Sequence, residues 1–109
     1  MKLPLDALIA RDKLVRYLLQ WRAENDKSLY LARAGYTIAS ADRLAQDIRE
    51  QLSPLDSEFL EATDYGPKYA IRGVLRGPNG TMLRVVTIWM KENATGITKF
   101  VTLFPSKEN

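Results

Sequence analysis

The 109-residue chain predicts a single α+β domain, residues 1–109, with two or three N-terminal helices packed on one face of a C-terminal antiparallel sheet. Two observations support this fold class. In the first half of the chain, apolar residues recur every three or four positions, which is typical of amphipathic helices. From Tyr65 onward the apolar period changes to two, and turn-forming residues divide this part into three strands.

The first helix is expected to begin near Asp12, a favourable N-cap residue. Its apolar stripe consists of residues at helical spacing, namely Leu14, Val15, Leu18, Leu19 and Trp21. A short second helix is expected from Ser28 to Ala34, with Leu29 and Ala32 as its apolar positions. Gly35 is expected to end it in the left-handed conformation.

Ser40 is expected to cap a third helix, because Leu44, Ile48 and Leu52 follow it at a spacing of four. Ser53-Pro54 is expected to end this helix.

Residues 55–64 are acidic and weakly patterned, so either a loop or a short edge strand fits them. As a strand they would make the sheet four-stranded. Phe59 and Leu60 are expected to hold this segment against the core.

The alternating part of the chain predicts a β-meander of three consecutive strands. The strands are expected at 65–76, 81–90 and 97–104, separated by turns at 77–80 and 92–96. The first turn, Gly-Pro-Asn-Gly, is a strong hairpin signal because Pro presets one dihedral and Asn-Gly accepts positive φ. The polar tail 106–109 is expected to fray.

The aromatic residues are expected to build the core and its rim rather than a ligand box, with Trp21 and Trp89 as core residues.

The charge of the chain is unevenly distributed, although its net value is only +3. Residues 1–46 carry a net +3, residues 47–64 carry −5, and residues 65–109 carry +5, with seven basic and two acidic side chains in the last segment. Such asymmetry bears on partners rather than on fold, and solvated faces are its simplest explanation.

The composition excludes several kinds of chemistry. Cysteine and histidine are absent, which removes disulfides, thiolate metal sites and the usual general base near neutral pH. The phosphate-loop, dinucleotide-binding and zinc-protease motifs are absent too, and no cofactor is expected. The carboxylates of Asp56, Glu58, Glu61 and Asp64 match no calcium loop, so no metal site is expected there.

The basic residues of the meander are candidates for nucleic-acid binding. Lys68, Arg72 and Arg76 share one face of the first strand, since residues two and four apart point the same way. Arg84 and Lys99 join them only if the strand register allows it. The candidate set, with one tyrosine for base stacking, is Lys68, Tyr69, Arg72, Arg76, Arg84 and Lys99. The alternative is the ordinary polar face of a one-sided sheet.

Such a face also has the residue types for RNA cleavage without metal or histidine. Arginine and lysine stabilise the charge that develops when the 2′-hydroxyl attacks the phosphate, and a carboxylate, tyrosine or lysine moves the proton. The meander supplies the needed types at Lys68, Tyr69, Arg72, Arg84 and Thr87.

The order of several short motifs resembles a bacterial family of small proteins, common in cyanobacteria, known as a domain of unknown function. The resemblance covers about Lys13 to Pro105. The motifs are Lys13-Leu14-x-x-Tyr17-Leu18-Leu19, Ala34-Gly35-Tyr36, Tyr65-Gly66-x-x-Tyr69, Leu75-x-Gly77-Pro78-Asn79-Gly80, Val86-Thr87-Ile88-Trp89 and Val101-Thr102-x-Phe104-Pro105. The resemblance implies no activity or catalytic residue. The order of helices and meander also resembles the architecture of metal-independent ribonuclease toxins, an analogy of fold only.

Two functions therefore remain open. The first is a non-enzymatic interaction module, which forms a homodimer or pairs with a small neighbouring protein. It is favoured by the missing catalytic signatures and by strand edges that another chain can pair with. The second is an RNA-binding or RNA-cleaving, toxin-like protein that uses the basic sheet face.

A cytoplasmic location is expected, because the N-terminus lacks the apolar core of a signal peptide. The alternative is a secreted effector that has no classical signal peptide. No membrane contact is expected either, since no window approaches ~18 uncharged apolar residues.

Overall fold

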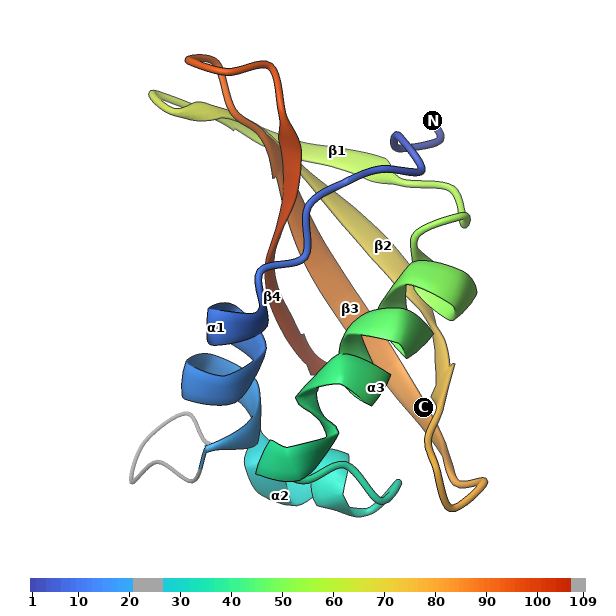
Figure 1. The fold of residues 1–109 in the computed structure, drawn as a ribbon. Coiled ribbons are helices and arrows are strands. Elements are labelled where there is room, and N and C mark those ends of the chain that lie inside the picture. The colour runs from blue at the N-terminus through green and yellow to red at the C-terminus, as the bar shows by residue number, and fades with distance from the viewer. Residues whose placement is uncertain (21–26, 107–109) are drawn as a thin grey trace.

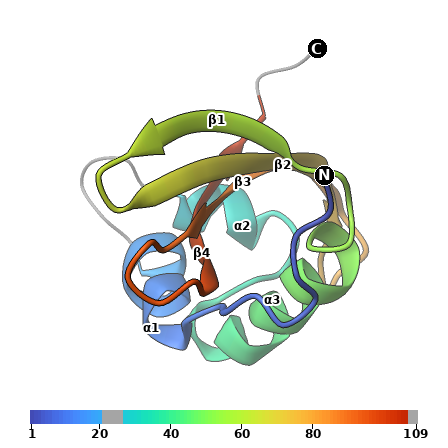
Figure 2. The same ribbon diagram turned by 90° about the horizontal axis from the view of Figure 1, so that it is seen from above.

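The computed structural model describes residues 1–20 and 27–106, except for the side chain of Tyr17. Four antiparallel strands form one sheet, and the helices lie on one side of it (Figures 1 and 2). Three predictions concern parts of the chain outside the described residues: the core position of Trp21, the packing of the Tyr17 side chain and the fraying of most of the C-terminal tail. The predicted α+β class, with helices before a C-terminal antiparallel sheet, is confirmed.

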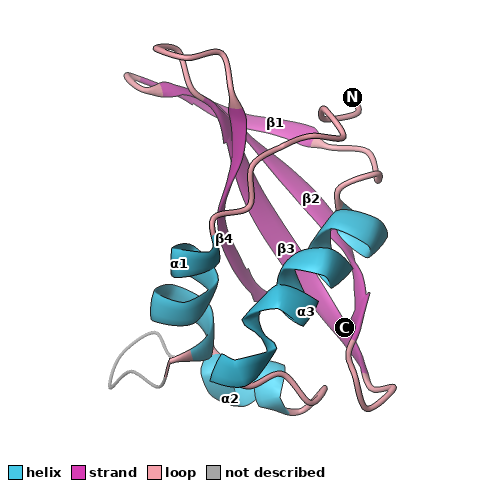
Figure 3. Cartoon of the chain, in the orientation of Figure 1, coloured by secondary structure: helices cyan, strands magenta, loops and turns pink. Residues whose placement is uncertain are grey.

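The helices of the described residues are short, and two of them are built from consecutive segments (Figure 3). In chain order these are α1 (Arg11–Lys13) continuing as the π-helical η1 (Leu14–Leu19), α2 (Ser28–Ala32), the 3-10 turn η2 (Ile38–Ser40), and α3 (Ala41–Asp47) continuing as the π-helical η3 (Ile48–Leu52). The strands are β1 (Glu58–Thr63), β2 (Gly66–Arg76), β3 (Met82–Lys91) and β4 (Thr98–Pro105).

The helix from α3 to η3 follows the predicted stripe, because Leu44, Ile48 and Leu52 are fully buried. The prediction for α2 was wrong in phase. Leu29 is 67% exposed and Ala32 is exposed, whereas Leu31 is fully buried. In a helix of five residues the sequence period is too short to fix the buried face.

The sheet is a simple meander in which each strand pairs with the next, in the order β1-β2-β3-β4. The acidic segment does supply the fourth strand, at one edge. The expected anchoring role of Phe59 and Leu60 is wrong, since they are 60% and 44% exposed. The helices reach only the inner part of the sheet, so the edge strand has no core to pack against (Figure 2).

The main core lies between the helices and one face of the sheet. Trp89 and Phe100 are buried there with their rings edge to face, 5.4 Å between centroids, which confirms Trp89 as a core residue. Thr87 is fully buried beside them: its hydroxyl donates to the carbonyl of Ile71 and accepts from the Trp89 indole N–H. Thr87 is therefore a structural residue and is no longer a candidate for RNA cleavage.

A buried polar network joins the helices to the end of β2. The hydroxyl of Tyr36 donates to the Asp47 carboxylate over 2.6 Å, and the Arg43 guanidinium Nε donates to both oxygens of the same carboxylate. Burial and the hydrogen bond to Asp47 raise the pKa of Tyr36 above its ordinary value, so its hydroxyl remains a donor. This network fixes α3 against the loop that follows α2.

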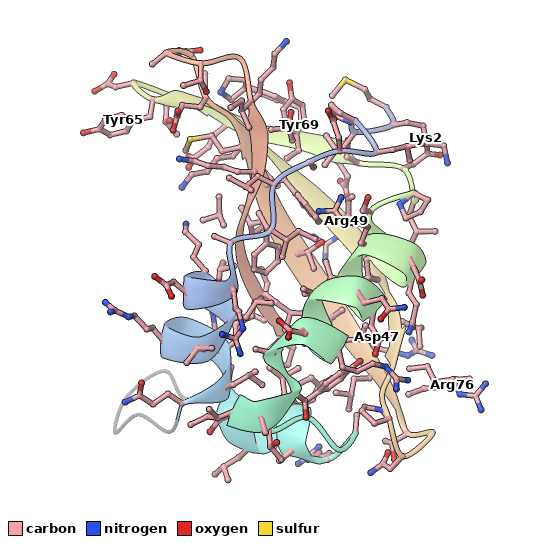
Figure 4. All side chains as sticks on the ribbon, in the orientation of Figure 1. Lys2, Asp47, Arg49, Tyr65, Tyr69 and Arg76 are labelled. Carbon is pink, nitrogen blue, oxygen red and sulfur yellow. The ribbon has the colours of Figure 1, made fainter. Side chains whose placement is uncertain are left out.

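The N-terminal segment crosses the molecule as an extended strap between the helices and the sheet edges. The guanidinium of Arg49 donates to the carbonyls of Leu5 and Ala7, and it lies between the helix and the strap in Figure 4. Further along, Leu8 forms a parallel bridge with Lys99 at the outer edge of β4. None of the helices in the described part of the chain is long and apolar enough to cross a membrane.

Four glycines of the described residues have positive φ, and two of them, Gly35 and Gly66, bear on how the elements are joined. Gly35 has φ 95° and ends the turn after α2, as predicted. Gly66 has φ 147° at the start of β2, and a Cβ there would lie 2.0 Å from the carbonyl oxygen of Lys91. The tight β1–β2 connection therefore requires glycine at this position.

Candidate nucleic-acid interface

The strand register decides which basic side chains share a face. The helix-facing side of the sheet carries Ile71, Leu75 and Trp89, all in the main core. The opposite side, which we call the open face, carries the even-numbered residues of β2 and β3, beginning with Lys68 and Met82. No helix in the described ranges covers this side of the sheet (Figure 2).

The strand register places Arg84 and Lys99 on the same face as the basic residues of β2, which the sequence alone left open. Arg84 lies opposite Val74, and Lys99 lies opposite Met90, which in turn pairs with Lys68. Five of the six candidate residues therefore belong to the open face by their position in the strands, namely Lys68, Arg72, Arg76, Arg84 and Lys99.

The sixth candidate, Tyr69, is on the other side of the sheet. It packs against the main core and contacts the ring of Phe59 edge to face, with 6.1 Å between the centroids. Because successive side chains of a strand point to opposite faces, Tyr69 points to the face opposite that of Lys68 and Arg72. It is therefore not available to stack bases on the open face.

The open face has an apolar floor beneath its charged side chains. Ala70, Val86 and Ile88 form a second small cluster there, with Val101 packed against it. All three are at most 8% exposed. This face is thus not the uniformly polar outer surface expected of a one-sided sheet.

Arg72 and Arg84 flank a shallow hollow on this face. The hollow has a volume of 180 Å³, and its other lining residues include Val74 and Ser106. It is smaller than the ~300–1,000 Å³ pockets that enclose small molecules. A charged group at the surface of a larger ligand, such as a phosphate of a polymer, suits this site better than a whole cofactor.

A carboxylate from the edge strand lies beside the hollow. Glu58 accepts a hydrogen bond from Arg72 Nε at 3.0 Å, and both side chains are at least half exposed. In register, Glu58 pairs with Ala70, so it stands on the open face. Glu61 pairs with Lys68 in the same register, so both glutamates of β1 stand beside the basic residues of β2.

Lys27 reaches the open face from the segment that precedes α2. Its ammonium donates to the hydroxyl of Thr102 over 2.8 Å, and burial lowers the pKa of Lys27. Thr102 faces this side because a β-bulge in β4 places an extra residue between the partners of Ile88 and Trp89. No sequence signal links Lys27 to Thr102, since they lie 75 positions apart.

A second group of cations gathers near the start of β4. The pKa of Lys13 is lowered by burial and then by the charges of Lys99 and Lys68. Lys99 donates a hydrogen bond to the carboxylate of Glu92. This hydrogen bond is the largest cause of the lowered pKa of Glu92. Basic groups thus extend from Lys68 and Lys99 to Arg72 and Arg84.

Arg76 stands apart from the other candidates. It is exposed at the β2–β3 hairpin end and projects away from the molecule in Figure 4, far from Tyr65 at the other end of the sheet. Its backbone N–H and carbonyl are bound by the side chain of Gln51.

The open face also carries functional side chains that the sequence-based set lacks, namely Glu58, Glu61, Lys27 and Phe104. Phe104 is 38% exposed and pairs with Val86, next to Arg72. Of these, only Glu58 and Glu61 have a sequence signal, as acidic residues in the segment before the basic strand. Within residues 1–20 and 27–106, no group of three or more histidine, cysteine, aspartate or glutamate residues could hold a metal ion.

Comparison with solved structures finds a similar fold in one chain of a contact-dependent growth inhibition toxin–immunity protein complex from Klebsiella pneumoniae 342. The TM-score is 0.56 at 13% sequence identity, over 94% of this chain and 96% of that chain. At this identity the likeness shows a shared fold alone. None of the curated proteins matches the sequence.

Family comparison gives a match over nearly the whole sequence. Residues 4–107 match a family described as Domain of unknown function (DUF6883). This agrees with the resemblance drawn from the order of the sequence motifs. The chain belongs to the DUF6883 family.

Proposed function

We propose that this chain is a toxin-like protein that binds RNA on the open face of its sheet and cleaves it without a metal ion. The observation that supports this most strongly is the register, which brings Arg72 and Arg84 together around one hollow beside the Glu58 carboxylate. Charge on that face, rather than net charge, is what an RNA backbone meets.

The two arginines suit a phosphodiester. A guanidinium presents several N–H donors in a rigid fork, and it remains charged at any physiological pH. Arg72 and Arg84 come from neighbouring strands, so their positions are fixed by the sheet rather than by a loop. Phe104 offers a partly exposed ring on the same face, on which a base could stack.

The same face carries a carboxylate for the first proton transfer. The row Glu58–Ala70–Ile88–Thr102 crosses the sheet, and Lys27 binds Thr102 at its far end. Three strand spacings of about 4.8 Å separate the ends of this row. The Glu58 carboxylate lies beside Arg72, whereas the Lys27 ammonium lies at the other edge of the sheet, so only Glu58 is placed to act on a phosphodiester bound at Arg72.

We assign the steps of cleavage as follows. Glu58 takes the proton of the 2′-hydroxyl, and the 2′-oxygen forms a bond to phosphorus. The bond from phosphorus to the 5′-oxygen breaks, and this oxygen takes up a proton from water. Arg72 and Arg84 stabilise the negative charge on the phosphoryl oxygens. The products are a 2′,3′-cyclic phosphate and a free 5′-hydroxyl.

The fold likeness supports a toxin-like role. The similar solved chain comes from a complex of a toxin with its immunity protein. Fold alone does not determine function, so the residues of the open face are the basis of this proposal.

RNA binding by the variant Arg72→Ala/Arg84→Ala tests the proposal. We expect its affinity for a single-stranded RNA to fall about ten- to hundredfold at low salt, because two charge-assisted contacts are lost. The slope of log affinity against log salt should become shallower by about 1.4, since each single-strand phosphate contact contributes ~0.7. Fluorescence anisotropy at several salt concentrations measures both quantities.

The control is Arg11→Ala/Arg33→Ala, which changes the net charge equally but on the helix side. Arg11 pairs with Asp42, and Arg33 lies over the ring of Tyr30. This variant should bind RNA like the wild type. Equal weakening by both variants would show a non-specific charge effect, and no RNA binding by the wild type at low salt would refute the proposed function.

A second candidate function is a non-enzymatic interaction module that forms a homodimer or pairs with a small neighbouring protein. The exposed edge strand β1 favours it, because unpaired strand edges accept further strands. The occurrence of the similar solved chain in a two-protein complex supports it as well. Analytical ultracentrifugation tests it: a chain that stays monomeric at high concentration, alone and with the product of an adjacent gene, contradicts it.

A further inference from the structure

The outer edge of β1 is the open edge of the sheet. β1 pairs with β2 on one side only. Among the described residues, no backbone hydrogen bond joins Glu58–Thr63 to any strand other than β2. By contrast, the start of the opposite edge of the sheet is occupied, since the N-terminal strap binds the first residues of β4 through Leu8, Thr98 and Phe100.

The N-terminal residues of the chain pair with the residues just before β1. Immediately before β1, the Ser57 N–H and hydroxyl both donate to the carbonyl of Met1, at 2.8 and 2.6 Å. Lys2 forms an antiparallel bridge with Asp56, and its ammonium lies 3.6 Å from the Asp56 carboxylate. Figure 4 shows Lys2 beside the start of the edge strand. An extended basic segment is therefore already seated on the first residues of this edge.

The charge of the edge strand selects among possible occupants. β1 carries Glu58 and Glu61, Asp64 follows it, and residues 50–64 contain no lysine or arginine. Pairing with β1 of a second copy would set like charges opposite one another, which destabilises a strand pair. A β-bulge between Phe59 and Glu61 further disfavours flat edge-to-edge pairing. Basic side chains on an incoming strand would instead gain favourable cross-strand pairs.

We infer that the outer edge of β1 docks an extended, lysine- or arginine-rich segment of a partner protein, added antiparallel as a fifth strand. This inference rests on the second proposed function, the pairing with a small protein, and it does not require RNA binding. The incoming strand would continue the line of the Met1–Lys2 segment along Glu58–Thr63. Backbone hydrogen bonds would supply affinity, and Glu58, Glu61 and Phe59 would select the side chains.

The test uses the full chain, ¹⁵N-labelled, and a short peptide in which lysine alternates with valine. We expect amide shift changes centred on Glu58–Thr63, together with slower hydrogen exchange of the outward β1 amides. The matched control is the same peptide with every backbone nitrogen methylated. It keeps the charge but has no backbone N–H to donate on either edge, so it should not bind. Equal binding of both peptides, or no change at β1 with the unmodified one, would overturn the inference.

A pair of charge variants checks the selectivity of the edge. Glu61→Lys should weaken binding of the unmodified peptide about three- to tenfold, because an attractive cross-strand pair becomes repulsive. Glu50→Lys makes the same charge change on η3 and should leave it unchanged. If the two variants weaken peptide binding equally, the effect comes from the overall charge of the protein and the inference is overturned.

The same spectra separate this inference from the second proposed function. A complex with the product of an adjacent gene that leaves the β1 amides unchanged overturns the edge as its docking site, although the pairing function stands. Binding of the lysine–valine peptide at β1 when no such complex forms supports the edge and removes that gene product as the partner.

Discussion

Replacing Glu58 with glutamine should lower the rate of RNA cleavage by about two to four orders of magnitude, the usual contribution of a positioned general base. Glutamine keeps the length of the side chain and can still accept a hydrogen bond from Arg72, but it cannot take the proton of a 2′-hydroxyl. RNA binding should therefore stay close to the wild-type value. The measurement is cleavage of a structured RNA in the presence of a metal chelator, followed on a denaturing gel.

The product ends and a control variant complete this test. The 5′ fragments should end in a 2′,3′-cyclic phosphate, which resists phosphatase until it is opened by acid. Glu50→Gln, an equivalent change on the helix side, should cleave at the wild-type rate. If Glu58→Gln cleaves as fast as the wild type, Glu58 is not the base. If the wild type binds RNA but cleaves none, the open face is a binding surface only.

Replacing Asp47 with alanine should destabilise the fold by about 2–4 kcal/mol. The Asp47 side chain is 6% exposed and accepts hydrogen bonds from both Tyr36 and Arg43. Without it, the buried Tyr36 hydroxyl keeps only a long contact of 3.4 Å with the carbonyl of Arg76. Arg43 is 51% exposed and returns to water, which keeps the cost below that of a fully buried broken pair.

Urea denaturation measures this loss of unfolding free energy. Asp42→Ala is the control, because its carboxylate belongs to an exposed pair with Arg11, the Asp42 side chain being 86% exposed. It should cost at most ~1 kcal/mol, like other surface ion pairs. Similar midpoints for Asp47→Ala and the wild type would show that the network adds no stability.

The fold was predictable where the sequence repeats its signal. Leu44, Ile48 and Leu52 repeat the helical spacing over three turns, and the alternation of β2 and β3 runs long enough to fix both faces. The prediction of burial failed where a segment is too short to show a period, or where burial depends on tertiary packing. In the five-residue helix the predicted phase was wrong, because Leu29 is exposed and Leu31 is buried. The exposure of Phe59 depends on how far the helices extend over the sheet.

The residues of the candidate site were predictable only in part. Alternation alone places Lys68 and Arg72 on one face, but the addition of Arg84 and Lys99 required the strand register. Lys27 comes from the start of a helix and meets the sheet only through the fold. Thr102 faces the open side because of a bulge that no local sequence rule predicts.

The most direct test of RNA binding on the open face is amide shift mapping with a short single-stranded RNA whose 2′-hydroxyls are methylated. Methylation blocks cleavage and leaves the phosphate backbone intact. We expect saturable shifts centred on Arg72, Arg84 and Thr102, which weaken as salt is raised. Shifts confined to the helices, or none at low salt, would contradict the proposal that this sheet face acts on RNA.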